Sequence, residues 1–309
     1  MTKKPTPSFK TWIAAARLRT LPLAFAVIAL GAGLASFHDK GSFEISIFLL
    51  AILTSFSYQV LSNYANDLGD GLRGTDAQKK GEQRAIASGA ISVTAMKNAV
   101  TLFTVLALFS GAILITLAFT SIWIQVVFHV LNLTAIWAAR SYTMGSNPYA
   151  YWGGGDLFVL VFFGYLGVLG SVALFTESFF WVDLLPATVA GVGSAAVLTL
   201  NNLRDLEGDS AHGKITLVVR YGEKWGRGYF KTLIAIAILA SLSFGLYAAI
   251  VLQHSAPLVV FLIFLFALRV VLKRFVKAQT PESIDPLLKP MALVTLLYCV
   301  GTALSIGIL

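Results

Sequence analysis

The chain has 309 residues, of which 57% are hydrophobic and 12% are charged, and its mean hydropathy is +0.78. A soluble domain of this length could not bury so much apolar surface, so the composition excludes a water-soluble globular protein and predicts a polytopic membrane protein. The formal net charge of +8 would suit nucleic-acid binding, but the placement of the basic residues points to another origin.

The chain begins with a basic segment, residues 1–19, ahead of the first apolar run. This segment lacks the short apolar core and the small-residue cleavage site of a signal peptide, so we expect it to remain on the protein as a cytoplasmic or interfacial segment. Residues 9–19 could form an interfacial helix whose Lys10, Arg17 and Arg19 face lipid headgroups. A simple polar tail is the alternative.

Nine apolar segments follow, each close to the ~20 residues that a helix needs to cross a bilayer. They cover residues 20–37, 43–65, 93–118, 121–139, 156–176, 180–200, 230–252, 257–273 and 288–308. No linker or low-complexity region separates them, so residues 1–309 are expected to form a single integral-membrane domain.

The basic residues lie on one side of this nine-span arrangement. Of the 23 Lys and Arg residues, only Lys40 falls in a loop on the opposite side. Loops rich in Lys and Arg remain in the cytoplasm, so we expect the N-terminus and the basic loops to be cytoplasmic and the C-terminus to lie outside. The positive net charge therefore reflects topology, and no nucleic-acid partner is expected.

The first informative polar stretch is NDLGDGLRGTD, residues 66–76, directly after the second span. Asn66 and Asp70 are four residues apart, and Asp67 and Asp70 are three apart. If the helix of the span extends into this stretch, these side chains share one face. A second stretch, NNLRDLEGD at residues 201–209, follows the sixth span and spaces two carboxylates, Asp205 and Asp209, by four residues.

Four spans separate the two acidic stretches, which indicates an all-α fold of two pseudo-repeated four-helix halves plus one helix. Membrane proteins built from such halves bind their ligands between them, so we expect the two stretches to face each other across a central cavity with a cytoplasmic cap. A solvated loop would explain any single Asp, but it explains poorly two clusters that each follow a span and each carry Asn.

The chemistry of these stretches favours a hard cation. Stacked carboxylates repel unless a cation lies between them, and carboxylate and amide oxygens without nearby Cys or His favour Mg²⁺. Mg²⁺ is usually held by one or two carboxylates together with substrate phosphates. Two facing clusters therefore predict a diphosphate clamped by Mg²⁺, and no protein nucleophile or P-loop is evident.

Basic and aromatic residues near the clusters complete the candidate site. Lys214 and Arg84 are placed to bind phosphate oxygens, whereas Arg220 is a weaker candidate because topology alone demands basic residues there. Tyr142 and Asp156, in RSYTMGSNPYAYWGGGD, could orient an aromatic co-substrate. The tyrosines of this block could instead belong to an interfacial aromatic belt.

NDLGDGLRGTD resembles the NDxxDxxxGxD motif of UbiA-type intramembrane prenyltransferases. NNLRDLEGDSAHGKITLVVRYG resembles their second motif in the form NNxRDxxxDxxxGKxTLxVRxG. That elaborated form, together with YTMGSNPYAYWGGGDLFVLVFFG and the N-terminal RLRTLPLAF, is similar to the branch that prenylates 1,4-dihydroxy-2-naphthoate in menaquinone synthesis. The resemblance extends over essentially the whole chain.

The resemblance implies nine transmembrane helices around a cavity open sideways to lipid, in a bacterial inner membrane. It implies a metal-binding set of Asn66, Asp67, Asp70, Asp76, Asp205 and Asp209. The catalytic set would be Asp70, Asp205, Asp209 and Lys214, and the diphosphate-binding set Asn66, Arg84, Asn202, Lys214 and Arg220. The donor would be an all-trans polyprenyl diphosphate, and transfer to the naphthoate with loss of CO₂ would give demethylmenaquinone.

Other functions fit less well. Related enzymes prenylate 4-hydroxybenzoate, haem or chlorophyll precursors, but the second motif argues against these acceptors. DLGDG at residues 67–71 also resembles the opening of CDP-alcohol phosphotransferases, yet the Ala-Arg pair and the nearby second DxxxD of those enzymes do not follow. A secondary transporter would place its ionisable groups near the bilayer midplane rather than at one face.

Overall fold

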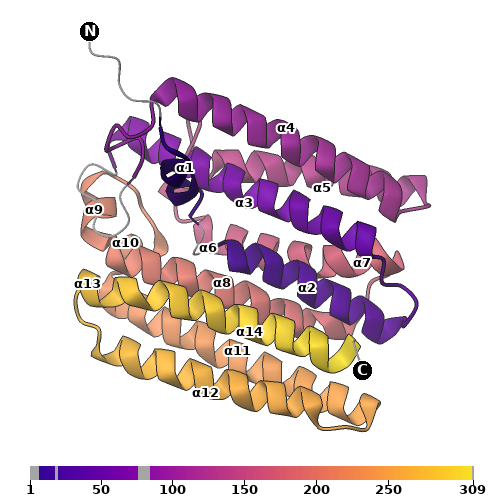
Figure 1. Ribbon diagram of the computed structural model, residues 1–309. Helices are drawn as coiled ribbons and strands as arrows, with labels where there is room; N and C mark the ends of the chain where they lie inside the picture. The colour runs from indigo at the N-terminus through magenta and orange to yellow at the C-terminus, as the bar shows by residue number, and fades with distance from the viewer. Residues whose placement is uncertain (1–6, 18–19, 76–83, 308–309) are drawn as a thin grey trace.

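The computed structural model describes residues 7–17, 20–75 and 84–307, and every regular element within them is helical (Figure 1). Nine helical segments in this part of the chain are long and apolar enough to cross a membrane. In order they are α2 (Leu21–His38), α3 (Ile45–Arg73), α4 (Val93–Ala118), α5 (Ile122–Ser141), a segment of α6 (Gly155–Val159), a π-helix (Leu160–Leu169) and α7 (Gly170–Thr176), a segment of a 3₁₀ turn (Trp181–Asp183) and α8 (Leu184–Arg204), α11 (Glu223–Leu252), α12 (Ala256–Lys277), and a segment of α13 (Pro281–Ile284), a 3₁₀ turn (Asp285–Leu287) and α14 (Leu288–Gly307).

Short elements gather at one end of the bundle (Figure 1). They are α1 (Phe9–Ala15), α9 (Leu206–Ala211), α10 (Leu217–Tyr221) and a 3₁₀ turn (Tyr149–Tyr151). The same end holds the C-terminal ends of α3 and α8, where the two acidic stretches lie. These elements therefore form a cap over that end of the bundle.

The nine predicted spans are confirmed, but α3 is longer than its apolar run. It continues past residue 65 through the polar residues Asn66 to Arg73 and ends at Gly74, whose φ of 76° forms a left-handed C-cap. Glycine takes this conformation at little cost, so it ends the helix cleanly. Hydropathy alone could not place the end, because it records burial in lipid rather than backbone conformation.

Small residues allow two pairs of helices to approach closely. On α2, a Cβ added to Gly33 would lie 2.4 Å from the Cα of Ala303 on α14. On α8, a Cβ added to Gly193 would lie 2.5 Å from the hydroxyl oxygen of Thr295 on α14. Close backbone approach between small residues is a main source of packing between transmembrane helices, so α14 closes the bundle between α2 and α8.

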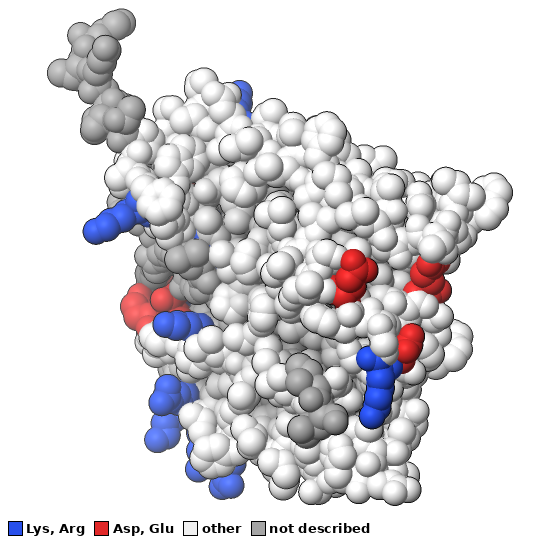
Figure 2. All heavy atoms as spheres, turned by 45° about the vertical axis from the view of Figure 1, so that its right-hand side comes forward, with Lys and Arg blue, Asp and Glu red and all other residues white. Residues whose placement is uncertain are grey.

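The charged side chains lie at the two ends of the molecule. On the face shown in Figure 2, Lys and Arg gather at one end, Asp and Glu predominate at the other, and the band between is uncharged. Such an uncharged band, together with the nine apolar helices, is the surface that a bilayer requires. The chain is a multi-pass membrane protein.

The N-terminal helix packs on the bundle. Trp12 of α1 contacts Tyr64 of α3, with ring centroids 5.5 Å apart, and the Asn63 side-chain amide donates to the Ala16 carbonyl at 2.8 Å. The predicted N-terminal helix is therefore present, over Phe9–Ala15. The expectation that Arg17 faces lipid headgroups is wrong. The chain turns at Arg17, where φ is 55°, and this residue lines the central cavity. Arg19 lies outside the described residues.

Candidate active site

A cavity of about 360 Å³ lies among α2, α3, α4, α5, the α6–α7 segment and α8. One face of α3 lines it over most of its length, from Ala51 through Ser55, Gln59 and Ser62 to Asn66. These residues recur every three or four positions, as one helix face requires. At 1.5 Å per residue, the lined stretch is roughly 22 Å long.

The walls of the cavity differ in polarity. The face of α3 contributes mainly hydroxyl and amide side chains, and the Tyr58 hydroxyl on that face donates to the side-chain Oδ1 of Asn132 on α5 at 2.6 Å. The α6–α7 segment contributes mainly apolar side chains, among them Phe158, Phe162 and Leu166. The cavity therefore suits a long apolar chain that carries a polar head.

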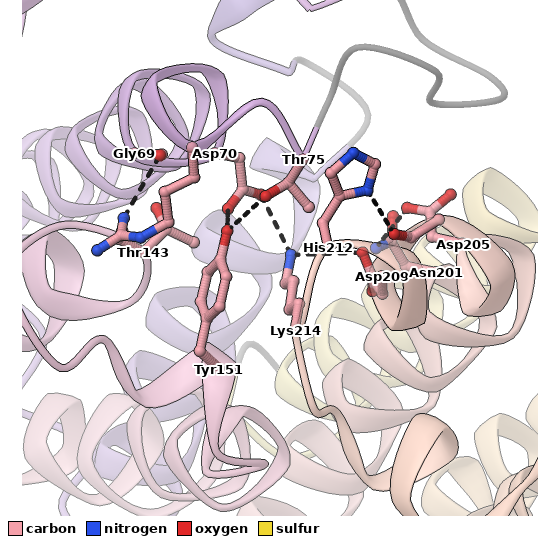
Figure 3. A network of polar contacts seen from close by, with 12 residues as sticks. Gly69, Asp70, Thr75, Thr143, Tyr151, Asn201, Asp205, Asp209, His212 and Lys214 are labelled. Atoms are coloured by element: carbon pink, nitrogen blue, oxygen red, sulfur yellow. Dashed lines mark hydrogen bonds and ion pairs between the residues drawn. The ribbon is translucent and has the colours of Figure 1, made fainter.

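The polar end of this cavity is the end beneath the cap. There Lys214 joins the two acidic stretches (Figure 3). Its Nζ donates to Oδ2 of Asp70 at 3.1 Å and lies 3.9 Å from Oδ1 of Asp209. All three residues are buried. Burial by itself would lower the pKa of Lys214, but the neighbouring charges of Asp70 and Asp209 outweigh it and raise that pKa above its ordinary value. The group is therefore a buried cation between two carboxylates from distant parts of the chain.

Tyr151 holds the other oxygen of Asp70. Its hydroxyl donates to Oδ1 of Asp70 at 3.0 Å and lies 2.7 Å from Oγ1 of Thr75. Burial, reinforced by the charge of Asp70, raises the pKa of Tyr151 to about 12, so the phenol keeps its proton. The Arg73 guanidinium lies 5.1 Å from the centre of the Tyr151 ring and donates to the Gly145 carbonyl. The sequence interpretation missed Tyr151, because its aromatic block was equally compatible with an interfacial belt.

Asp67 contacts a loop rather than the Lys214 centre. Its two carboxylate oxygens accept from the backbone N–H groups of Ala85 and Ile86 at 3.0 and 3.1 Å. This pair of hydrogen bonds fixes the backbone directly after Arg84, whose side chain is buried. Asp76, the other predicted acid of this stretch, lies outside the described residues.

The second acidic stretch is divided between two helices. α8 ends at Arg204, and Asp205 has a non-helical backbone, with φ of −94° and ψ of 6°. Asp209 lies in α9 beyond this break, although its N–H still donates to the Asp205 carbonyl at 2.8 Å. Asn66 and Asp70 therefore share one helix, as expected, whereas α8 ends within the second stretch and Asp205 and Asp209 do not lie on one continuous helix.

Asp205 is paired with the residue before it. Its Oδ1 accepts from Nε of Arg204 at 2.7 Å, and its Oδ2 accepts from Nη2 at 2.8 Å. Asn201, which lines the cavity, accepts from Nη2 of Arg204 at 2.7 Å. The sequence interpretation selected Asn202, but the structure brings Asn201 to the cavity. Both Asn201 and Arg204 were missed, since adjacent positions in NNLRD cannot be separated until the helix face is known.

The predicted ring-binding residues lie on either side of a small hollow. Tyr142 lines both the cavity and this hollow, whereas Asp156 and Asn202 line the hollow alone. Burial raises the pKa of Tyr142 to about 12. Of the two predicted ring-binding residues, only Tyr142 therefore reaches the cavity itself. Arg220 is exposed and donates to the Trp152 carbonyl at 3.0 Å, away from the Lys214 centre.

The donor atoms suit a metal ion that arrives with other ligands. In the described part of the chain, no three His, Cys, Asp or Glu residues are grouped to hold a metal ion by themselves. Asn66 lines the cavity, and its Oδ1 is buried without a hydrogen-bond partner among the described residues. Such an atom requires an explanation, and a partial set of oxygen donors is what Mg²⁺ needs when phosphate oxygens complete its shell. The residues present therefore fit Mg²⁺.

Comparison with known proteins gives a consistent result. Residues 23–297 match the model of the UbiA prenyltransferase family. The chain is 38% identical to a 1,4-dihydroxy-2-naphthoate octaprenyltransferase of Haemophilus influenzae, covering 97% of this chain and 96% of that protein. It is 37% identical to the protein of the same name from Escherichia coli, with 99% of each covered.

A solved structure shows the same fold. It is that of a UbiA homologue from Archaeoglobus fulgidus bound to DMAPP and Mg²⁺, with a TM-score of 0.63 and 17% sequence identity, covering 94% of this chain and 99% of that one. At this identity the likeness concerns the arrangement of the helices alone.

Proposed function

Because the chain belongs to the UbiA prenyltransferase family, we propose that it transfers an all-trans polyprenyl group from polyprenyl diphosphate to 1,4-dihydroxy-2-naphthoate. The transfer releases diphosphate and CO₂ and gives demethylmenaquinol, the reduced form of demethylmenaquinone, because no oxidant takes part. The naphthoate acceptor rests on the names of the two relatives that match nearly the whole chain. The second acidic motif, NNLRDLEGD, supports the same branch.

The contact of Lys214 with Asp70 and Asp209 is the observation that supports this proposal most directly. It brings both acidic stretches to the polar end of a long cavity with an apolar wall. A polyprenyl diphosphate needs charged residues at one end for its diphosphate and an apolar wall beyond them for its tail. A transporter of a polar solute, or an enzyme with only water-soluble substrates, would have no use for the apolar part.

We assign the residues as follows. Asn66, Asp70, Asp76, Asp205 and Asp209 would hold Mg²⁺ together with the diphosphate, and Asp67 would hold the adjoining loop. Lys214 and Arg84 would bind the diphosphate oxygens, with Asn202 and Arg220 more distant from them. Tyr142 and Asp156 would orient the ring. The bound metal would neutralise charge on the diphosphate as it departs.

The chain's own residues account for the remaining steps. Lys214 carries a positive charge toward the diphosphate and stabilises it as the carbon–oxygen bond breaks. The apolar wall of Phe158, Phe162 and Leu166 excludes water from the allylic cation that results. Tyr142 lines the same cavity as Lys214 and Phe158, and we assign it the orientation of the electron-rich ring. No protein nucleophile is required.

We further propose that the capped end of the bundle, with the active site, is cytoplasmic and that the C-terminus lies outside, in the inner membrane of a bacterium. The clustering of Lys and Arg at the capped end supports this orientation. The enzyme would then receive both substrates from the cytoplasm or the bilayer.

A substrate panel on membranes containing the protein tests the proposal. Labelled polyprenyl diphosphate should be incorporated into a lipid-soluble product with 1,4-dihydroxy-2-naphthoate, with Mg²⁺ present and not with EDTA. Equal or faster incorporation with 4-hydroxybenzoate would overturn the choice of acceptor. Incorporation that survives EDTA would overturn the metal dependence.

A further inference from the structure

Arg204 is shared between the second acidic stretch and the C-terminal part of the chain. Two of its nitrogens pair with both oxygens of Asp205, at 2.7 and 2.8 Å. A third, Nη1, donates to Oδ1 of Asp285 at 2.5 Å. Asp285 opens the 3₁₀ turn between α13 and α14, so this guanidinium connects the end of α8 to the C-terminal hairpin formed by α12 and α14.

The burial of this group makes its charge balance important. The side chain of Arg204 is 1% exposed and that of Asp205 is 3% exposed, whereas that of Asp285 is 31% exposed. A buried ion pair costs much desolvation, and removing one partner leaves the other uncompensated. Arg204 therefore needs an anion at all times, and two carboxylates are available to supply it.

The pairing geometry limits what Asp205 can do. A carboxylate that receives a bidentate guanidinium has both oxygens engaged. Each oxygen keeps a lone pair that can coordinate a cation, but that cation then lies close to the positive charge of Arg204, which opposes its binding. Asp285 binds a third nitrogen of the same guanidinium and can hold it while Asp205 binds the cation.

We propose that Arg204 is a positioning residue, shared between Asp205 and Asp285, that sets the affinity of the second acidic stretch for a divalent cation and diphosphate. This inference rests on the proposed function, since it takes the diphosphate site as given. Asp285 draws the positive charge away from Asp205 and so favours the cation. Without Asp285, Arg204 would stay on Asp205 and compete with the cation.

The alternative is that Arg204 only fastens α8 to the C-terminal hairpin. Basic residues are stabilising in the last turn of a helix, where Arg204 lies. A purely structural contact would change the stability of the fold when removed. It would leave the affinity for the cation unchanged, so the two roles can be separated by measurement.

The test uses the purified full chain in detergent and measures the Kd for Mg²⁺ at fixed inorganic diphosphate, by isothermal titration and by thermal stabilisation. Asp285→Asn keeps the shape of the side chain and removes its charge. We expect it to raise this Kd by about tenfold, the change that ~1.4 kcal/mol produces. Glu223→Gln is the matched control, because it removes a similar carboxylate–arginine contact, Glu223 with Arg227, on the exposed surface of α11. It should leave the Kd unchanged.

A double-mutant cycle identifies the route of the effect. If Asp285 acts through Arg204, then Asp285→Asn should have no effect on the Kd in an Arg204→Gln background. Arg204→Lys provides a second background that keeps the charge but loses the bidentate fork, should Arg204→Gln fold poorly. In that background we expect the effect of Asp285→Asn to be reduced.

An unchanged Kd in Asp285→Asn, or the same increase with and without Arg204, would overturn the inference. Because no acceptor is present, these results do not depend on which ring is prenylated. Failure of the unmodified protein to bind Mg²⁺ and diphosphate at all would overturn the proposed function as well. Binding without coupling would overturn this inference alone.

Discussion

Lys214 and Asp70 are buried charges that depend on each other. Each would pay a large desolvation cost alone, and together with Asp209 they keep a charged state inside the cap. Tyr151 adds a hydrogen bond to Asp70 from a third segment of the chain. Because Lys214 and Tyr151 hold the Asp70 carboxylate in place, it is already oriented for the metal-bound diphosphate that would replace these contacts.

Asp70→Asn tests the role of this charge. The amide keeps the shape of the side chain and can still accept from Tyr151, but it no longer carries the charge that a metal-bound diphosphate requires. We expect kcat/KM to fall by at least about 100-fold, as when a preorganised electrostatic contact is removed. Prenyl transfer by purified protein measures it.

Asp39→Asn is the control, because Asp39 lies in an exposed loop at the opposite end of the bundle. It should behave as the unmodified protein does. Turnover near normal in Asp70→Asn, with the protein still folded in the membrane, would contradict the assignment of Asp70.

At the scale of elements, the apolar runs and the acidic stretches were enough to predict the spans and the meeting of their ends. The predicted contact across the cavity is present because α3 and α8 end at the same side. The break at Asp205 could not be predicted, because the residues at the break, Arg204 and Asp205, include neither proline nor glycine. Tyr151 could not be predicted, because its partner, Asp70, comes from α3.

The loop anchored by Asp67 gives a prediction at this scale. Its hydrogen bonds to Ala85 and Ile86 fix the position of Arg84, so Asp67→Ala should raise the KM for the prenyl donor by about tenfold, within the range for hydrogen bonds to a charged group. Arg84→Ala should have a similar effect. The double variant should be no worse than either single one, because both remove the same contact with the donor.

The outcome also separates the two roles open to Asp67. If it were a metal ligand instead, Asp67→Ala would raise the half-saturating Mg²⁺ concentration, and its effect would add to that of Arg84→Ala. Steady-state kinetics with varied donor and varied Mg²⁺ distinguish the two.

The contact between α2 and α14 can be tested through Gly33. A Cβ there would meet backbone atoms of Ala303, which cannot move aside as a side chain can. Gly33→Ala should therefore lower the free energy of unfolding by about 1–3 kcal/mol. Gly228→Ala in α11 is the matched control, because nothing lies within 4 Å of its added Cβ. Thermal unfolding in detergent should show it to be neutral or slightly stabilising.

For the molecule as a whole, composition and the distribution of Lys and Arg predicted both the membrane fold and its expected orientation. The cavity was predicted only in outline, since its volume and the polarity of its walls depend on which face each helix turns inward. The polar face of α3 is an example: Ser55, Gln59 and Ser62 are spread through an apolar run and become a wall only when the helix is packed.

The orientation can be measured with single cysteines, because Cys299 is the sole native cysteine and is buried. In a Cys299→Ser background, Lys40→Cys should react with a membrane-impermeant maleimide added outside intact cells. Lys224→Cys, at the capped end, should react only after the membrane is opened. The reverse pattern would show that the cap faces outward.

The length of α3 has a consequence for the lipid around the protein. Its 29 residues span about 43 Å, whereas the hydrocarbon layer is about 30 Å thick. The last turns, which carry Asn66 and Asp70, therefore stand above the acyl chains in a bilayer of ordinary thickness. Longer acyl chains would bring the edge of the hydrocarbon layer closer to these two polar side chains. Turnover in reconstituted vesicles should accordingly decline as the acyl chains of the host lipid are lengthened.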